Sequence, residues 1–226
     1  MQEVLILGRG LLGAEIEKQT GWRCLSHDEF DVVRFEEHGE YPRWDEKVII
    51  NCIGYTRTYD QDKSRHEKML FGVDNLINFC ELFDKKLIHI STDYLYAGSV
   101  DYATEEDLPV PIKTWYGHYK LIADEIIKLR MSNYLICRGT HKPKPFRYEL
   151  AWLNQVGNFD YVDVIARLII KLIKKGAVGT YNVGTEEKTM YQLAMKTRHV
   201  KGVQCPLEIV PKNVTMNLDK LNSFLS

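Results

Sequence analysis

Tyr116 and Lys120 are the residues whose types and spacing most directly indicate chemistry. They bracket the stretch Tyr116-Gly117-His118-Tyr119-Lys120, in a segment with helical apolar spacing, where positions i and i+4 share one face. A nearby cation favours phenolate, so we expect Lys120 to lower the pKa of Tyr116. Such a tyrosine can exchange a proton with a substrate oxygen near neutral pH. The alternative is an amphipathic helix with a solvated lysine.

A second pattern lies near the N-terminus, where a short apolar run leads into Gly8-Arg9-Gly10-Leu11-Leu12-Gly13. A GxGxxG motif between a strand and a helix is typical of dinucleotide binding. Gly8 would make the tight turn, Gly10 would let the backbone approach a pyrophosphate, and Gly13 would allow helix–strand packing. The helix N-terminus would offer free amides to the phosphates. The alternative is a tight turn without a ligand.

The elements that must position these residues alternate between strand and helix patterns. Alternation of this kind predicts an α/β fold, a Rossmann-type doubly wound parallel sheet. Ligands bind such sheets at the carboxyl ends of the strands, where the segments 51–56 and 91–96 lie. The expected strands are Glu3–Leu7, Arg23–Leu25, Lys47–Cys52, Lys86–Ile90 and Tyr134–Cys137. The expected helices are Leu11–Thr20, Met69–Phe83 and Tyr116–Arg130.

The pattern changes after about residue 140. The stretch His141-Lys142-Pro143-Lys144-Pro145 breaks regular structure. A helix at Val162–Lys175, a strand near Thr180–Val183 and a helix from about Met190 are expected to follow. We therefore predict a dinucleotide-binding Rossmann domain at 1–140. A small, shortened substrate-binding lobe at 141–226 is expected to be interleaved with the sheet.

Composition narrows the function classes. The chain has 226 residues, a net charge of −1 and 27% charged residues, so neither nucleic acid nor a membrane surface is an expected partner. Five scattered cysteines without ligand spacing predict no protein-built metal site. No signal peptide pattern and no long apolar stretch are seen, so we expect a cytoplasmic location.

Taken together, the motifs resemble the extended short-chain dehydrogenase/reductases, and within them dTDP-4-dehydrorhamnose reductase and related sugar-nucleotide reductases. The matching segments are Gly8–Gly13, Asn51–Thr56, Ser91–Tyr96, Tyr116–Lys120, Asn158–Ala166, Gly179–Gly184 and Asn217–Leu221. The resemblance implies an NAD(P)-dependent oxidoreductase that reduces the C4 ketone of a nucleoside-diphosphate 4-keto-6-deoxy sugar.

The resemblance also implies roles for individual residues. Thr92 would hydrogen-bond the reacting oxygen, Tyr116 would protonate it, and Lys120 would tune the tyrosine and hold the nicotinamide ribose. The implied cofactor-binding residues are Gly8, Arg9, Gly10, Leu11, Leu12, Gly13, Asp31, Val32, Ile53, Gly54, Tyr55, Tyr116 and Lys120. The implied substrate-binding residues are Thr92, Asp93, Tyr94 and His141. Hydroxyls that cap a strand end and tyrosines that merely pack are the structural alternatives.

The cofactor is expected to be NADP, with NAD as the alternative. Arg9 lies inside the glycine motif, as in GDP-fucose synthases, and could pair with a 2′-phosphate. Ser26, His27 and Asp28 follow the second strand. An acid there would instead favour a free ribose hydroxyl.

Three departures from the family pattern bear on function. Met69 replaces the usual asparagine, His141 replaces a substrate-side tryptophan, and the span Lys142–Asn158 is short. His141 could stack on or hydrogen-bond a sugar or base, or merely fill a loop. Two other functions therefore stay open: a sugar-nucleotide epimerase with tightly held cofactor, and a non-catalytic NADP-binding regulatory subunit. A homodimer, formed through a helix pair in many relatives, is a further option.

Overall fold

A six-stranded parallel sheet forms the centre of the computed structural model, which describes residues 3–34, 41–205, 208 and 210–226. The strands, in spatial order, are β10 (Gly179–Asn182), β5 (Tyr134–Arg138), β4 (Lys86–Ile90), β3 (Val48–Asn51), β1 (Val4–Leu7) and β2 (Arg23–Leu25). All five pairings in this sheet are parallel. The predicted Rossmann-type fold is therefore confirmed.

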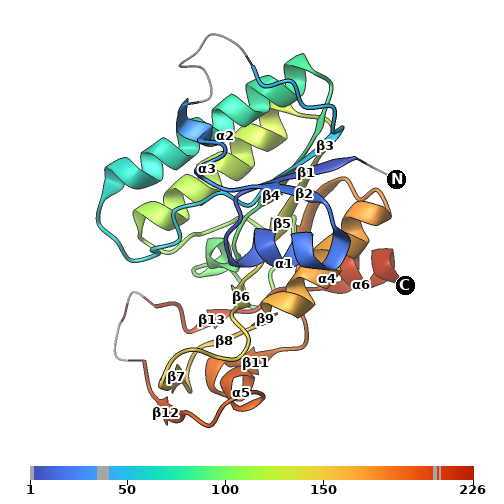
Figure 1. Cartoon of the computed structure of the whole chain (residues 1–226). Helices are drawn as coiled ribbons and strands as arrows, with labels where there is room; N and C mark the ends of the chain where they lie inside the picture. The colour runs from blue at the N-terminus through green and yellow to red at the C-terminus, as the bar shows by residue number, and fades with distance from the viewer. Residues whose placement is uncertain (1–2, 35–40, 206–207, 209) are drawn as a thin grey trace.

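Helices cover both faces of the sheet (Figure 1). One face carries α1 (Leu11–Thr20), α4 (Val162–Lys174) and α6 (Asp219–Leu225), and the other carries α2 (Lys63–Leu82) and α3 (Trp115–Arg130). Successive strand residues point to opposite faces, so Ile6 packs under α1 and α4 while Leu7 packs under α2 and α3. All four residues of β1 are buried, because their side chains pack alternately against the helices on the two faces of the sheet.

The helix expected at Met69–Phe83 begins six residues earlier, at Lys63. The six residues before Met69 are all polar, so the apolar spacing gives no sign of them. The Asp62 side chain accepts a hydrogen bond from Ser64 N at 3.1 Å and caps the helix. Met69 consequently lies in the second turn rather than at the start of the helix.

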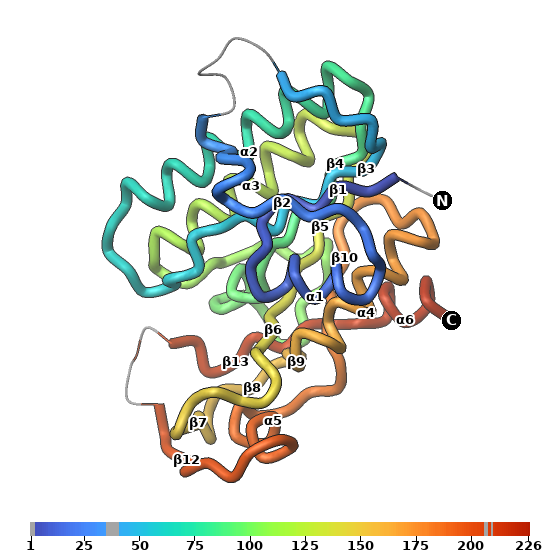
Figure 2. The backbone as a smooth tube through the Cα atoms, viewed as in Figure 1, coloured from blue at the N-terminus to red at the C-terminus, as the bar shows by residue number. Residues whose placement is uncertain are grey.

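The segment after residue 140 builds a small lobe below the sheet (Figure 2). Its short strands and helix pack around a separate core that includes Phe146, Phe159, Tyr161 and Leu193. The elements are β6 (His141–Lys142), β7 (Leu150–Trp152), β8 (Val156–Gly157), β9 (Asp160–Tyr161), β11 (Lys188–Thr189), α5 (Met190–Met195), β12 (Lys201–Val203) and β13 (Asn213–Val214). These short strands lie outside the strand–helix alternation that predicted the central sheet, so the sequence did not predict them.

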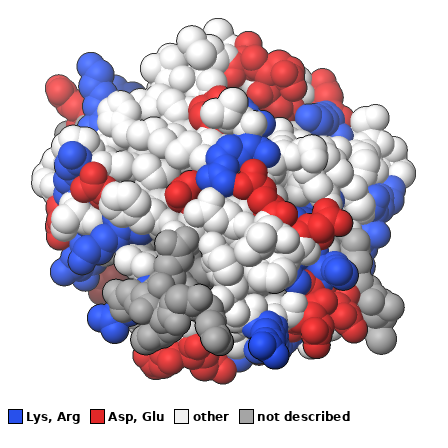
Figure 3. Space-filling model, turned by 90° about the horizontal axis from the view of Figure 1, so that it is seen from above, with Lys and Arg blue, Asp and Glu red and all other residues white. Residues whose placement is uncertain are grey.

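The chain returns from the lobe to the sheet through α4 and β10, and α6 then packs beside α4. The remaining elements, η1 (Val32–Arg34) and η2 (Asp93–Tyr96), are single 3₁₀ turns that follow strands β2 and β4. On the face seen in Figure 3, acidic and basic side chains are intermingled. Among the described residues, no helix is long and apolar enough to cross a membrane.

Candidate active site

The glycine-rich turn joins β1 to α1 in the geometry that the sequence predicts. Gly8 has φ +99°, a region that disfavours side chains, and a Cβ on Gly13 would lie 2.1 Å from the Gly8 carbonyl oxygen. A Cβ on Gly10 would meet nothing within 4 Å. Gly10 is the N-cap of α1, and no described side chain caps the helix there. The free amides and the helix dipole therefore face open space, which suits an anion.

A cavity of about 260 Å³ opens beside this turn. Its lining residues are Gly8, Arg9, Gly10, Ser26, His27, Phe30, Cys52, Ile53 and Gly54. Asp31 and Val32, the pair implied for the adenine side, lie outside it. The Asp31 carboxylate accepts from Val33 N at 3.0 Å, and Val32 is buried against Gly72 of α2. The neighbouring Phe30, which the sequence analysis missed, supplies an aromatic wall instead.

Arg9 is held by acidic partners at the edge of this cavity. Its guanidinium pairs with Glu17 at 3.1 Å and with Glu29 at 3.3 Å, and it donates to the Cys24 carbonyl. Glu29 also accepts hydrogen bonds from the backbone and hydroxyl of Ser26, both at 2.8 Å. A 2′-phosphate would therefore compete with two carboxylates for Arg9.

A central cleft of about 400 Å³ continues from the glycine turn towards the lobe. Gly10, Leu11 and Leu12 line one end, and Tyr116, Lys120, His141 and Lys142 line the other. Gly54 lines both this cleft and the first cavity. The structure thus brings the glycine motif and the YxxxK motif, more than 100 residues apart in sequence, to one continuous space.

Tyr116 and Lys120 lie on the first turns of α3. The helix is capped by Thr114, whose hydroxyl accepts from Gly117 N at 3.2 Å. The Lys120 ammonium donates to the Ile90 carbonyl at the end of β4, at 2.7 Å, and lies close to Gly54. The lysine is therefore fixed between the sheet edge and the loop after β3.

The expectation that Lys120 lowers the pKa of Tyr116 is wrong in this structure. Burial raises the pKa of the Tyr116 phenol to about 12, although an interaction with the Thr92 hydroxyl opposes this. Burial also lowers the pKa of Lys120. Sequence spacing reveals the shared helix face but not the desolvation, which dominates here. A phenol that keeps its proton at neutral pH suits a proton donor.

The residues after β4 divide into buried and cleft-lining groups. Thr92 is 2% exposed and its hydroxyl accepts from Tyr94 N at 3.2 Å. Asp93 is fully buried and accepts from the Thr140 hydroxyl at 2.6 Å, and burial raises its pKa to about 6. Tyr94 reaches the lobe, where its hydroxyl accepts from Gln155 Nε2 at 3.0 Å.

A third cavity, of about 640 Å³, lies between these residues and the lobe. It shares Thr56, Thr58, Lys142 and Tyr148 with the central cleft. Its walls are strongly aromatic and include Tyr59, Tyr94, Phe146, Tyr148 and Trp152. Most of these come from the short-stranded segment, where only the aromatic content of the sequence could have singled them out. His141 lines the central cleft, and burial lowers its pKa to about 4.

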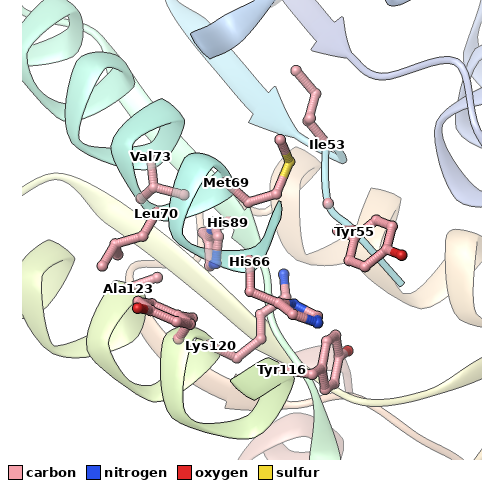
Figure 4. A pocket seen from close by; sticks show the side chains of 12 residues that line it. Ile53, Tyr55, His66, Met69, Leu70, Val73, His89, Tyr116, Lys120 and Ala123 are labelled. Carbon is pink, nitrogen blue, oxygen red and sulfur yellow. The ribbon is translucent and has the colours of Figure 1, made fainter. Parts of the chain in front are cut away.

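Tyr55 lines a smaller cavity together with Tyr116 and Lys120 (Figure 4). Its hydroxyl donates to the Asp60 carboxylate, and its ring meets the His66 ring edge-on at a centroid distance of 4.9 Å. Met69 lines the same cavity. Within the described part of the chain, no three His, Cys, Asp or Glu residues cluster as metal ligands would.

Comparison with known proteins places this geometry in a family. The RmlD substrate-binding domain model matches residues 1–141. A dTDP-4-dehydrorhamnose reductase of Mycolicibacterium smegmatis is 32% identical over 158 residues, which are 66% of this chain and 42% of that protein. For this protein and two further curated relatives, the matched part of the chain spans between 42% and 59% of each relative's length.

Solved structures agree on the fold. A dTDP-4-dehydrorhamnose reductase of Bacillus anthracis in complex with NADP superposes with a TM-score of 0.79 at 23% identity, covering 99% of this chain and 92% of that one. The Bordetella bronchiseptica enzyme WbmH in complex with NAD⁺ gives a TM-score of 0.76 at 11% identity, covering 100% and 93%. With a family model matched over more than half of its length, this chain belongs to the RmlD substrate-binding domain family.

Proposed function

We propose that this protein catalyses the NADPH-dependent reduction of the C4 ketone of a nucleoside-diphosphate 4-keto-6-deoxy sugar. The observation that carries the proposal is the position of Tyr116. It lines the central cleft, which begins at the glycine turn and shares four lining residues with the cavity in the lobe. The similar Mycolicibacterium smegmatis protein, a dTDP-4-dehydrorhamnose reductase, supports this reaction class.

The residues present fit a dinucleotide. The space at Gly10 accepts a close backbone approach, and the amides of Leu11 and Leu12 at the start of α1 would bind the pyrophosphate. Ser26 and Phe30 would border the adenosine, and Tyr116 and Lys120 would border the nicotinamide ribose. When bound, the nicotinamide supplies the hydride. We assign cofactor-binding roles to Gly8–Gly13, Ile53, Gly54, Tyr55, Tyr116 and Lys120.

Protonation of the reduced carbonyl oxygen falls to the protein. Tyr116 would donate its phenolic proton to the developing alkoxide, and Thr92 would hydrogen-bond the same oxygen. Lys120 would stabilise the phenolate that forms. Tyr94, His141 and the aromatic lobe residues would hold the nucleotide sugar. Asp93, which is buried behind Thr140, would act by holding this loop rather than by touching the sugar.

NADP remains the expected cofactor, and the NADP bound to the similar Bacillus anthracis structure supports it. The Arg9 contacts with Glu17 and Glu29 favour the NAD alternative, because those carboxylates would repel a 2′-phosphate. The NAD⁺ bound to WbmH supports that alternative. Arg9 would have to exchange its partners for NADP to be preferred.

Two properties of the whole molecule complete the proposal. Residues 1–140 would act as the cofactor domain and 141–226 as the substrate lobe, with a cytoplasmic location giving access to both ligands.

Apolar side chains of Phe71 and Leu82 on α2, and of Ile122 and Leu129 on α3, are exposed by 41–85%. A homodimer would cover this helix pair. Sedimentation of the wild-type protein as a dimer and of the Leu129→Glu variant as a monomer would support that arrangement.

The direct test is oxidation of NADPH and NADH with dTDP- and GDP-linked 4-keto-6-deoxy sugars, with Tyr116→Phe alongside. Turnover that collapses in Tyr116→Phe supports the reductase and identifies the nucleotide. An epimerase would instead purify with tightly held cofactor, and a regulatory subunit would bind cofactor without turnover. Cofactor binding without NADPH oxidation would contradict the reductase for these sugars.

A further inference from the structure

The central cleft and the aromatic cavity of the lobe meet at a polar junction. It is lined by the four residues that both spaces share, which are Thr56, Thr58, Lys142 and Tyr148. The two threonines come from the loop after β3, and Lys142 ends β6. In the pairing of β6 with β9, the Cα partner of Lys142 is that of Tyr161. The lysine therefore projects from a paired strand rather than from a loop.

Lys142 supplies the positive charge of this junction. Among the described residues that line the aromatic cavity, Lys142 is the one lysine or arginine and Glu149 is the one acid. The other lysine that lines the central cleft is Lys120, and its ammonium already donates to the Ile90 carbonyl at 2.7 Å. An anionic group that lies between the two spaces would therefore meet Lys142.

The ammonium of Lys142 has no direct partner. The residue is half-buried, and among the described residues no hydrogen bond or salt bridge holds its Nζ. Asp93 is the acid close enough to raise the pKa of Lys142, but burial of the lysine outweighs this and lowers the pKa. Asp93 itself is fully buried, and its Oδ1 accepts from the Thr140 hydroxyl at 2.6 Å. A poorly solvated cation without a partner is costly, and a bound anion would offset that cost.

The spaces on the two sides of the junction fit the two ends of a nucleotide sugar. Tyr116 lines the central cleft, where the ketone must lie to receive its proton. The cavity of about 640 Å³ has the aromatic walls on which a base can stack. In a nucleotide sugar the diphosphate joins the sugar to the nucleoside, so it would lie at the junction. The Thr58 hydroxyl, which makes only a 3.4 Å hydrogen bond to the Thr56 carbonyl, is a further donor there.

We propose that Lys142 binds the diphosphate of the nucleotide sugar at this junction and thereby directs the sugar end of the molecule towards Tyr116. The inference rests on the proposed function for the identity of the ligand. The Lys142 ammonium donates charge-assisted hydrogen bonds to the phosphate oxygens, and the Thr58 hydroxyl donates beside it. Lys142 is thus a specificity-determining residue, because a sugar without a diphosphate cannot make this contact.

The contact is tested by binding, without any turnover. The protein, loaded with NADP⁺ to occupy the glycine turn, is titrated calorimetrically with GDP, dTDP and UDP. At least one diphosphate should bind, and its Kd should rise about tenfold or more in Lys142→Met and recover in part in Lys142→Arg. The matched control is Lys144→Met, which removes a nearby lysine that pairs with Asp163 at 2.7 Å. No binding of any diphosphate, or equal Kd values in Lys142→Met and Lys144→Met, would overturn the proposal.

A second measurement uses the wild-type protein, so it does not depend on how a variant folds. Reductive methylation followed by mass spectrometry reports the accessibility of each lysine. The diphosphate that binds should slow the methylation of Lys142 at least about tenfold and leave that of Lys144 unchanged. Equal methylation of Lys142 with and without the diphosphate would overturn the proposal.

The cofactor carries the other diphosphate of this site, and it is tested separately. Lys142→Met should leave the Kd for NADPH unchanged, whereas a weaker NADPH affinity with an unchanged Kd for the nucleoside diphosphate would overturn the proposal. In turnover, the KM for the nucleotide sugar should rise about tenfold in Lys142→Met at a nearly unchanged kcat, because the contact is present before and during the reaction. Diphosphate binding through Lys142 in a protein that reduces no sugar would support the site and contradict the proposed function alone.

Discussion

Arg138 and Asp124 form an ion pair with Nε and Oδ2 3.0 Å apart, and both side chains are fully buried. Arg138 ends β5, and Asp124 lies one helical turn beyond Lys120 on α3. Arg138 also donates to the Tyr96 hydroxyl at 2.7 Å, and Tyr96 in turn donates to Asn182 at 3.0 Å. The pair therefore ties the helix that carries Tyr116 and Lys120 to the sheet.

Breaking this pair should destabilise the fold strongly. Arg138→Met leaves the Asp124 carboxylate buried without its partner, so we expect the free energy of unfolding in urea to fall by about 3–5 kcal/mol. The control is Arg130→Met, which removes solvent-accessible pairs with Asp74 at 2.9 Å and with Glu81 and a hydrogen bond to Asn78; it should cost about 1 kcal/mol for each pair or less. Equal losses in the two variants would contradict a special role for the buried pair.

The glycine motif gives a matched pair of variants that separates ligand binding from folding. Gly10→Ala places a methyl group in open space, so stability should be unchanged while the dinucleotide Kd rises at least about tenfold, because the methyl group occupies the phosphate path. Gly13→Ala forces a methyl group against the Gly8 carbonyl and should lower Tm. Calorimetric titration and thermal unfolding measure the two effects. Unchanged dinucleotide affinity in Gly10→Ala would contradict a pyrophosphate site at this turn.

Cofactor preference should depend on the contacts of Arg9. If Arg9 binds the 2′-phosphate, Arg9→Leu should raise the Kd for NADPH about tenfold and leave that for NADH unchanged, since a charge-assisted contact contributes about 1.4 kcal/mol or more. Glu29→Gln should strengthen NADPH binding by removing a competing carboxylate. Fluorescence titration with both cofactors measures this. The same Kd ratio in Arg9→Leu and wild type would assign Arg9 a structural role with Glu17 and Glu29.

Asp93, which is buried, and His141, which is half-buried at the central cleft, should give opposite pH dependences of stability. The pKa of Asp93 is raised from 3.8 to about 6 in the folded protein. Its stabilising contribution is therefore greatest below the unfolded pKa and is lost as pH rises through about 6. The pKa of His141 is lowered from 6.5 to about 4. Its contribution is present above about pH 6.5 and is lost as pH falls towards 4.

Single variants should reveal these opposed contributions. Relative to wild type, Asp93→Asn should make the free energy of unfolding rise more steeply from pH 4 to 6.5, and His141→Gln should make it rise less steeply over the same interval. Each contribution amounts to roughly 3 kcal/mol at most, because a difference of one unit between the folded and unfolded pKa corresponds to about 1.4 kcal/mol. Urea unfolding at several pH values measures the slopes. Parallel curves for both variants and wild type would show that neither group titrates differently on folding.

The sequence predicted those parts of the molecule that repeat a local pattern. Helix Leu11–Thr20 and strand Lys86–Ile90 have the predicted bounds, because an apolar run or face extends over their whole length. The start of α2 was missed, since its first turns are polar and are held by the Asp62 cap. The lobe strands were missed because they are short and lie outside the strand–helix alternation, which did reveal the equally short strand Arg23–Leu25.

The candidate site was predictable where a residue acts through its backbone or its place on one helix. The glycine turn and the Tyr116–Lys120 spacing are of this kind. Burial is a tertiary property, so the raised pKa of Tyr116 could not be read from spacing. The same holds for the carboxylates around Arg9, which lie 8 and 20 residues away from it. Phe30 and the aromatic lobe residues lacked a motif altogether.

The proposed reaction requires that a hydride pass from NADPH to a sugar ketone and that Tyr116 supply the proton. The most direct test is a single turnover with NADPH deuterated at the transferred position, with mass spectrometry of the product sugar. We predict one deuterium at C4 of the product, with the rate in Tyr116→Phe, measured at saturating NADPH, reduced at least about 100-fold. Product without deuterium, or label transfer at the wild-type rate in Tyr116→Phe, would contradict the account.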